Sequence, residues 1–255
     1  MLSHGPTTDL LTAFYGREVL LADRELVEQN CVAMLQRGAG AKDACLLVVG
    51  DPMGATTHAD LMVRAIELGV EVELVHNASV VNAVGCTGLQ LYRFGETVSV
   101  VFWTQTWRPT SFVDRVLENR RRALHTLCLL DIKVKEQSDE NLIKGRRVFE
   151  PPRFMSCAEA AGQILEAIES TTGADDDALS ASTPCVGVAR LGWPDEQLAF
   201  GSLSEMSTAE LGPPLHSLVV CAEPLHPIEL SVLRARCRQL GALSPIAESA
   251  GERHT

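Results

Sequence analysis

The feature that most constrains this chain is a run of apolar residues, Cys45–Val49, that ends abruptly in a glycine-rich turn. The turn contains Gly50, Asp51 and Gly54, and a helical pattern begins near Thr57. Continuous apolar runs of this length are typical of buried strands in parallel sheets. Ligands of open α/β sheets bind just beyond the carboxyl ends of such strands, where glycines let the backbone approach. The segment predicts either a ligand-binding turn or an ordinary strand-to-helix connection, and it matches neither of the common glycine-rich nucleotide motifs.

Length and composition limit the classes of protein to which this chain can belong. Its 255 residues suffice for one large domain or two ordinary ones, and 46% hydrophobic with 22% charged residues is typical of a soluble globular protein. The net charge of −11 argues against binding to nucleic acid or to anionic membranes, because both require a basic face. No apolar run approaches the roughly 20 residues of a membrane span. The first residues lack the apolar core of a secretory signal.

A local basic patch remains an alternative to a uniformly acidic surface. Basic residues concentrate in Arg120–Arg122 and in the segment that contains Lys144, Arg146 and Arg147. Such clusters are more often the solvated face of a helix than a binding patch. Both interpretations stay open at this point.

The cysteines and histidines favour core packing over metal binding. The eight cysteines include no C-x-x-C pair and mostly lie in apolar patterns, which predicts reduced core thiols in a cytoplasmic protein. His58, His76, His125 and His216 each lie at the edge of a predicted element, but no H-x-x-x-H or H-x-H spacing occurs among the seven histidines. The sequence therefore predicts no metal site.

Strands and helices alternate along the chain in two blocks. This alternation predicts βαβ units and a parallel sheet, and hence an α/β fold with two domains. We place the domains at residues 1–106 and 107–243, followed by a tail at 244–255 that we expect to be disordered. In the first block we expect a helix that ends at Gly16, strands at 18–23, 45–49, 70–75 and 97–103, and helices at 24–35 and 57–68.

The second block contains the clearest helix start in the sequence. Ser156 is a good N-cap and Glu159 follows three residues later, which is the spacing of a capping box. The acidic stretch 171–183 predicts a mobile loop. The remaining expected elements are a helix at 112–124, strands at 126–134, 185–191, 197–200 and 217–221, a helix at 156–170 and a helix at 227–240.

Several unusual strings in the chain resemble those of one enzyme family. Between Phe14 and Glu229 they occur in the same order as in the diphthine synthases, and the eukaryotic form is the closer fit. Because long strings match in order, the resemblance is specific. The strings that carry it are Gly50–His58, His76–Ser79, Asn82–Cys86, Gln90–Thr97, Phe102–Thr104, Thr106–Pro109, His125–Ser138, Asn141–Arg146, Phe149–Arg153 and Pro214–Leu218.

The resemblance implies a methyltransferase of the tetrapyrrole-methylase type, in which two α/β domains hold S-adenosylmethionine in the cleft between them. The implied substrate is the modified histidine of elongation factor 2, which is methylated on the way to diphthamide. In the eukaryotic family the amino group is trimethylated and a carboxylate is esterified. The resemblance further implies a cytoplasmic enzyme and is compatible with a homodimer. A methylase acting on a tetrapyrrole would share the fold but not these strings.

Carried over onto the matching positions, the resemblance implies a set of cofactor contacts. They are Asp51 and Gly54 in the first turn, Ser79 and Val80 in the second, and Leu130, Leu191 and His216 in the second domain. These positions coincide with turns that the strand and helix pattern predicts independently. Methyl transfer from a sulfonium is an in-line displacement whose leaving group needs no acid, so positioning supplies much of the rate. We expect no protein nucleophile, and no residue can be assigned as the catalytic base.

Three groups of arginines are candidates for contact with the acceptor. In the scheme that the resemblance implies, Arg108, Arg153 and the run Arg120–Arg122 are placed to meet an acidic group of the substrate. Arginine suits a carboxylate because its planar guanidinium can donate to both oxygens.

The first residues depart from the family pattern. The family opens with an apolar strand that ends in a glycine-rich turn, whereas residues 1–9 are short and contain Gly5-Pro6. We therefore expect the first domain to lack a central strand and to be less protected than the second. The alternative is a truncated, weakly active or inactive form that acts only as a binding partner. Binding of S-adenosylhomocysteine would separate the two interpretations.

Overall fold

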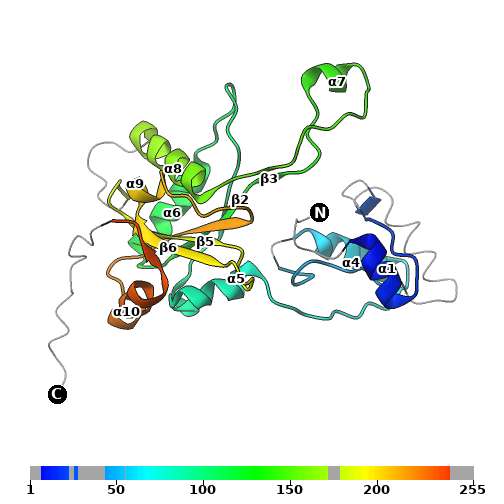
Figure 1. Cartoon of the computed structure of the whole chain (residues 1–255), viewed down its shortest axis with the longest axis horizontal. Coiled ribbons are helices and arrows are strands. Elements are labelled where there is room, and N and C mark those ends of the chain that lie inside the picture. Colours follow the sequence, from blue (N-terminus) through cyan, green and yellow to red (C-terminus); the bar gives the residue numbers. More distant parts are fainter. Residues whose placement is uncertain (1–6, 23–25, 28–43, 55, 172–178, 242–255) are drawn as a thin grey trace. The chain divides into compact units, whose positions relative to one another are not determined.

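The computed structural model describes residues 7–22, 26–27, 44–54, 56–171 and 179–241. The chain divides into two units, Met1–Ser79 and Val80–Thr255 (Figure 1). This division comes earlier than the boundary expected after residue 106, and the extent of the two domains stays a prediction. The expected helix at 24–35, the tail at 244–255 and most of the acidic loop lie wholly or largely outside the described residues.

Two helices of the first unit begin and end where the sequence indicates. Helix α1 (Thr8–Tyr15) starts after Thr7, whose side chain accepts from the N–H of Leu10 at 3.3 Å, and ends at Gly16 with φ 61°. Helix α4 (His58–Glu67) ends before Gly69, whose φ is 72°. Glycine takes this left-handed conformation without the steric penalty that a side chain brings, so it terminates helices readily.

The strands expected in the first unit are not formed. Residues 45–48 and 70–75 belong to no strand, and neither do the described residues of the expected strand at 18–23. An apolar pattern reports only which side chains could be buried, whereas a strand also requires a hydrogen-bonded neighbour. Without such a partner in the part of the chain that the structure describes, these runs form no regular secondary structure.

The described residues of the second unit form a mixed six-stranded sheet with the order β1-β2-β7-β5-β6-β8. The pairs β1–β2 and β6–β8 are parallel, and the three central pairs are antiparallel. The expected parallel sheet is therefore wrong for this unit, because β5 and β6 are joined by a short turn that reverses the chain. The strands are β1 (Val98–Val100), β2 (Thr126–Leu130), β5 (Pro184–Ala189), β6 (Gln197–Ser202), β7 (His216–Val220) and β8 (Arg238–Gln239).

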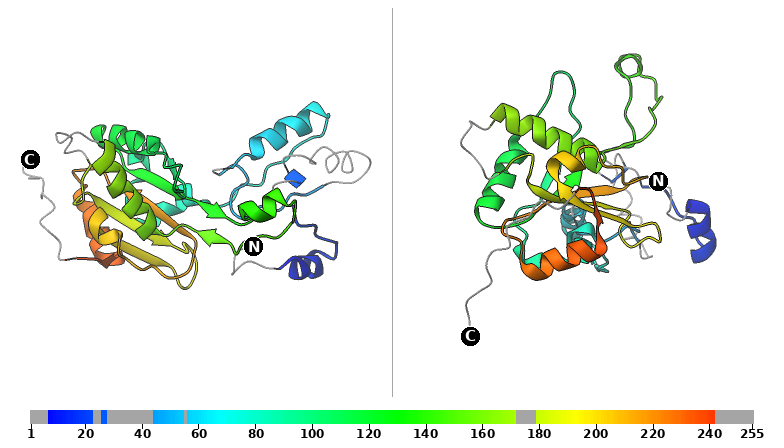
Figure 2. Two further views of the ribbon diagram at one scale, coloured as in Figure 1. Left: turned by 90° about the horizontal axis from the view of Figure 1, so that it is seen from above. Right: turned by 60° about the vertical axis from the view of Figure 1, so that its left-hand side comes forward.

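Helices cover both faces of this sheet (Figure 2). Alternate residues of a strand point to opposite faces, so Cys185 packs in one core cluster and Val186 in the other. The first cluster includes residues of α6 (Ser111–Arg121), α8 (Cys157–Thr171) and α9 (Leu203–Met206). The second includes residues of α10 (Pro227–Arg236), η1 (Val84–Thr87) and, at its margin, α5 (Val80–Ala83). The result is a three-layer α/β/α arrangement.

The expected strand at 126–134 is interrupted at Asp131. The N–H of Asp131 donates to the carbonyl of Val100 at 3.0 Å, and its own carbonyl accepts from the N–H of Met155 at 3.0 Å. The chain then continues as β3 (Ile132–Lys133), which pairs with β4 (Arg153–Phe154) in a separate two-stranded sheet. Helix α7 (Asp139–Ile143) lies between these two strands in sequence.

Five cysteines are buried in the second unit, as the apolar patterns predict. Burial raises the pKa of Cys128 and of Cys157 to about 12. Such thiols remain protonated and unreactive at neutral pH. The buried cysteines are Cys128, Cys157, Cys185, Cys221 and Cys237.

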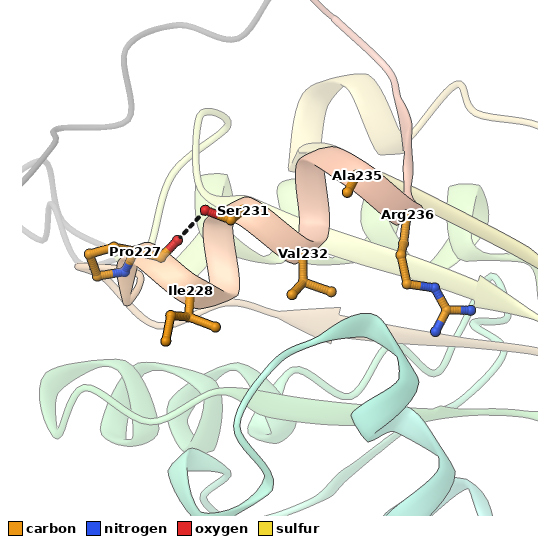
Figure 3. A pocket seen from close by; sticks show the side chains of 6 residues that line it. All are labelled: Pro227, Ile228, Ser231, Val232, Ala235 and Arg236. Atoms are coloured by element: carbon orange, nitrogen blue, oxygen red, sulfur yellow. Dashed lines mark hydrogen bonds between the residues drawn. The ribbon is translucent and has the colours of Figure 1, made fainter.

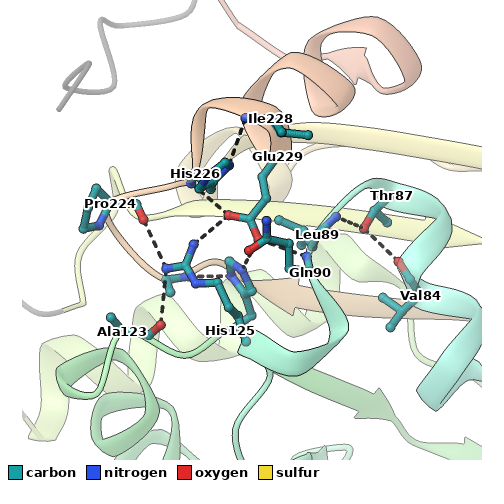
Figure 4. Close-up of polar contacts among 12 residues, drawn as sticks. Val84, Thr87, Leu89, Gln90, Ala123, His125, Pro224, His226, Ile228 and Glu229 are labelled. Carbon is teal, nitrogen blue, oxygen red and sulfur yellow. Dashed lines mark hydrogen bonds and ion pairs between the residues drawn. The ribbon is translucent and has the colours of Figure 1, made fainter. Parts of the chain in front are cut away.

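A buried ion pair ties α10 to the rest of the second unit (Figure 4). The Glu229 carboxylate is inaccessible to solvent and accepts from Arg93 at 2.7 Å and from Nε2 of His125 at 3.1 Å. It also accepts from the N–H groups of Gln90 and His226 at 2.9 Å each. These bonds satisfy a charge that would otherwise be costly to bury.

Candidate functional site

Asp51 organises a polar turn in the first unit. Its Oδ1 accepts a hydrogen bond from the N–H of Met53 at 2.8 Å. Its Oδ2 accepts from the N–H of Asn77 and from Nδ1 of His76, at 3.0 Å each. Asp51 thus joins the two turns of this unit in which the resemblance places cofactor contacts.

Two glycines let these turns approach each other closely. A Cβ atom on Gly50, which has φ 90°, would lie 3.2 Å from the carbonyl oxygen of Ala78. A Cβ atom on Gly54 would lie 2.8 Å from Cβ of Ser79, which is closer than real Cβ contacts allow. The structure therefore brings Asp51, Gly54 and Ser79 together, and a larger residue at position 54 would push the turns apart.

The hydrogen bonds hold the Asp51 side chain in its charged form. The N–H of Asn77 contributes most to lowering its pKa, followed by the N–H of Met53 and by His76. A carboxylate has about four lone-pair directions, and three bonds to Asp51 are formed within the described residues. Among the described residues these three bonds leave one of the four acceptor directions of Asp51 unused.

In the second unit, the ends of four neighbouring strands, β1, β2, β7 and β5, lie side by side. They form one edge of the sheet, by which we mean the border that runs across the strands and not an outermost strand. Val100 at the end of β1 lies opposite Leu130 at the end of β2. Strand β7 runs antiparallel to both β2 and β5, so its first residue, His216, lies at the same edge opposite Ala189. Leu191 follows Ala189 by two residues. The register therefore brings Leu130, Leu191 and His216 to one edge.

The contacts of His216 define its protonation. Its Nε2 lies 3.1 Å from the carbonyl oxygen of Gly212 and 3.0 Å from that of Pro213, so Nε2 carries the proton. Its Nδ1 accepts from the N–H of Cys157 at 3.4 Å. Burial lowers the pKa of His216, and the half-buried ring is therefore a neutral, oriented side chain.

Arg190 lies in a turn, Arg190–Gly192, that the strand pattern indicates as a third strand-end turn, but the pattern does not reveal the structural role of its side chain. Its φ is 52° and its side chain is nearly buried. The guanidinium donates to the carbonyl of Leu211 at 2.9 Å and forms an ion pair with Asp195 at 2.7 Å. It also donates to the carbonyl of Pro213, so it braces the segment that leads into His216.

Asp131 is a second residue of this edge, and the sequence-based prediction of the site does not include it. Its Oδ2 accepts from the N–H of Phe102 at 3.0 Å and lies 3.4 Å from Nζ of Lys133. An acidic residue directly after an apolar strand is the signal that could have found it. Asp131 fixes the ends of β1 and β2 relative to each other.

The predicted cofactor contacts divide between the two units. Val80 is the first residue of α5 and packs against the second core cluster. Leu191 packs against the same cluster, whereas Leu130 is buried in the first. Of the predicted cofactor contacts, Asp51, Gly54 and Ser79 belong to the first unit and the other four to the second.

Three of the arginines expected to meet the acceptor form ion pairs within the chain. Arg153 donates to both carboxylate oxygens of Glu136, at 2.7 and 2.9 Å, and lies 4.4 Å over the ring of Phe102. Arg108 pairs with Glu166. Arg120 pairs with Glu223 at 2.7 Å. A role for them toward the substrate stays a prediction, and it would require these pairs to open or to share a partner.

An open groove runs along one side of α10 (Figure 3). Its volume is about 470 Å³ and its lining is mainly apolar. None of the predicted cofactor contacts lines it. The lining residues are Pro227, Ile228, Ser231, Val232, Ala235 and Arg236.

Comparison with known proteins decides the family. The model of the Tetrapyrrole (Corrin/Porphyrin) Methylases matches residues 7–207. A diphthine methyl ester synthase from Bos taurus is 55% identical over 226 residues, which cover 88% of this chain and 79% of the relative. This chain belongs to the diphthine synthases of the tetrapyrrole methylase family.

Solved structures agree with this assignment. A crystal structure of a diphthine synthase superposes with a TM-score of 0.74 and 28% identity, covering 92% of this chain and 81% of the other. A related crystal structure from Entamoeba histolytica has a TM-score of 0.76 and 37% identity, covering 91% and 82% of the two chains. The α/β fold of the tetrapyrrole-methylase type, which the resemblance implies, is confirmed.

The family assignment makes this chain a methyltransferase of diphthamide formation. The expected enzyme class is confirmed. Among the described residues, no helix combines the length and the apolar character needed to cross a membrane.

Proposed function

We propose that this diphthine synthase uses S-adenosylmethionine to methylate the modified histidine of elongation factor 2, forming the methyl ester of diphthine. The observation that carries this proposal is the 55% identity, over 88% of the chain, to a relative named diphthine methyl ester synthase. The free buried thiols are compatible with the reducing cytoplasm, where we place the reaction.

The strand-end residues fit the chemical groups of the proposed cofactor. Asp51 is held in its charged form, and a carboxylate is a strong acceptor for a hydroxyl or ammonium group. Leu130 and Leu191 offer apolar surface at the edge of the second unit's sheet. Gly54 keeps the first-unit turns close enough for their backbone to contact a ligand. We propose that these residues, with Ser79, Val80 and His216, hold the cofactor.

When bound, S-adenosylmethionine supplies an electrophilic methyl group on a sulfonium. The chain's own task is then to bind, to orient and to exclude water. The enzyme holds the donor and the acceptor at near-attack distance. The loss of translational entropy that would slow the same reaction in solution has then already occurred on binding, and this supplies much of the acceleration. The neutral His216 ring, fixed by bonds at both nitrogens, adds no charge that would repel a sulfonium.

The acceptor requires proton handling that the strand-end residues do not obviously provide. An amine must lose a proton before it attacks, whereas a carboxylate attacks as it is. Esterification of a carboxylate therefore needs no base. Trimethylation of the amine would need water or a substrate group as the proton acceptor.

The test combines cofactor binding with product analysis. Calorimetry with S-adenosylhomocysteine should show binding by the full chain and weaker binding by Asp51→Ala and by His216→Ala. Arg234→Ala, an exposed change on α10, should bind as the parent does. Mass spectrometry of elongation factor 2 that carries the unmethylated modified histidine should then show methyl addition. A parent chain that binds no S-adenosylhomocysteine, or adds no methyl group, would overturn the proposal.

A further inference from the structure

Residues 131–155 form an arm that leaves the second unit's sheet and returns to it. The arm begins at the end of β2, runs along β3 to α7, and returns through β4 to the start of α8 (Figure 1). Bonds along its length hold its two sides together. The N–H of Glu150 donates to the carbonyl of Glu136 at 2.8 Å, and the Gln137 side chain donates to the carbonyl of Arg146. These hydrogen bonds give the arm a defined structure.

The outer part of the arm exposes apolar and basic side chains side by side. Ile143 is 85% exposed, Val148 54% and Phe149 45%. Arg146 and Arg147 are exposed, and neither side chain has a partner within the part of the chain that the structure describes. Exposed apolar patches often mark interaction sites. Arginine is also enriched at protein interfaces, so this combination of side chains is typical of a surface that binds another protein.

The base of the arm is part of the candidate cofactor site. Asp131, where the arm begins, holds the ends of β1 and β2 together. Cys157 follows the end of the arm and donates its N–H to His216. A protein acceptor that delivers its side chain to these strand ends therefore approaches the edge from which the arm emerges.

We propose that the arm is a docking element for the protein substrate, and that Arg146 and Arg147 engage an acidic surface beside the acceptor histidine. This inference rests on the proposed function, because it takes the substrate to be a protein. The net charge of the chain is −11, so its overall charge repels an acidic partner. A local pair of arginines gives such a partner one attractive approach, which raises the association rate and selects the orientation.

The first experiment measures how fast the full chain associates with elongation factor 2 that carries the unmethylated modified histidine, by interferometry at low and high salt. The double variant R146E/R147E should lose about tenfold in association rate at low salt, with a smaller loss at high salt. Arg147→Glu should lose part of that rate. Arg234→Glu, which reverses an exposed arginine on α10, should keep the parent's rate.

The second experiment tests the apolar part of the arm. Ile143→Ser should raise the dissociation rate at least about threefold, because it removes apolar surface from the contact. Ile228→Ser provides a matched control, since Ile228 is 63% exposed on α10. It should dissociate as the parent does. Both exposed substitutions leave the buried cores intact, and fluorescence of the tryptophans would verify folding.

The outcomes separate docking from catalysis. If the parent binds the substrate without methylating it, the proposed function fails while docking by the arm can still hold. If the parent methylates but the arm variants match it in both rate constants, docking is wrong and the function stands. Equal losses in R146E/R147E and Arg234→Glu, no binding by the parent, or a change of oligomeric state confined to the arm variants would each overturn the proposal.

Discussion

The two units of this diphthine synthase position their site residues by different physical means. In the second unit a hydrogen-bonded register brings Leu130 and His216 to one edge, with a core on each face of the sheet. In the first unit, Ala65 is the one buried residue among those described. There, the turns are joined through the side chain of Asp51. The predicted contacts of the second unit are positioned by a sheet, and those of the first unit by a few polar contacts.

This difference affects how strongly single substitutions change folding stability and ligand affinity in each unit. A register supported by two core clusters is cooperative, so a single surface change hardly moves a strand end. A turn held by one carboxylate and one close glycine contact responds to single substitutions. The first unit should therefore be the more sensitive half for ligand binding, and the second the more sensitive half for folding.

The largest expected difference is in hydrogen exchange. Amides in the paired strands β5 and β7 should exchange at least about a thousandfold more slowly than those of residues 45–48 and 72–75, because the latter belong to no strand. Native-state exchange followed by mass spectrometry would measure this. Comparable protection in both sets would show that the first-unit segments have partners and would remove the contrast between the units.

The next largest effect concerns the buried ion pair. Glu229→Ala should destabilise the second unit by about 3–5 kcal/mol, because it leaves Nη1 of the Arg93 guanidinium and the Nε2–H of His125 without their acceptor. Denaturant unfolding followed by tryptophan fluorescence reports on this unit, since Trp103, Trp107 and Trp193 all lie in it.

Glu96→Ala is the control for that measurement. It removes an exposed ion pair with Arg115 and should cost no more than about 1 kcal/mol. If both variants unfold at the same denaturant concentration, the Glu229 network does not stabilise the unit.

A third prediction addresses the first-unit turns. In Gly54→Ala the new methyl group would meet Cβ of Ser79, so we expect binding of S-adenosylhomocysteine to weaken about tenfold. The tryptophan unfolding transition should not move, because the change lies outside the second unit. Calorimetry and denaturant titration together measure both quantities.

Gly162→Ala is the matched substitution in the second unit. Gly162 lies in α8, and a Cβ atom there would meet nothing within 4 Å. Replacing a helical glycine by alanine should stabilise the unit by about 0.5–1 kcal/mol without changing ligand affinity. Unchanged binding by Gly54→Ala would mean that the close approach of the turns does not matter for the ligand.

The smallest expected effect is the dependence of stability on pH. Burial lowers the pKa of His125, reinforced by the charges of Arg93 and Arg120 and opposed by Glu229; burial also lowers the pKa of His216. In the window below about 6.5 the unfolded chain therefore binds more protons than the folded one. Stability of the second unit is fully present above that value, and falls as the pH drops through the lowered folded-state pKa values.

The first-unit turns should respond in a more acidic window. The pKa of Asp51 is lowered, so its contribution is present above the ordinary aspartate value of about 3.9 and is lost only as the pH falls through the lower folded-state value. Fluorescence unfolding at pH 7.5 and 5.5 should show a loss for the second unit. The affinity of the chain for S-adenosylhomocysteine should be the same at both pH values, because Asp51 stays charged at both. A flat unfolding profile between them would contradict the assignment of neutral buried histidines.

The sequence by itself determined the local features of this protein. Side-chain periodicity and capping residues are short-range signals, so helices such as α4, α6 and α8 begin and end within a few residues of the expected positions, and the N-cap of α8 is formed by Ser156 as the capping spacing indicates. The specific strings also determined the family, because their order along the chain resembles that of one group of enzymes.

Only the tertiary structure decided which elements pair and which charges are already used. The mixed order of the sheet and the capture of Arg153 by Glu136 depend on partners that are distant in sequence. Residues 45–48 form no strand because the described part of the chain provides no partner for them. Hydrogen bonds and ion pairs are contacts in space, and a linear pattern records only the propensity to make them. For the same reason Asp51 could be predicted as a site residue, whereas its three partners across two turns could not.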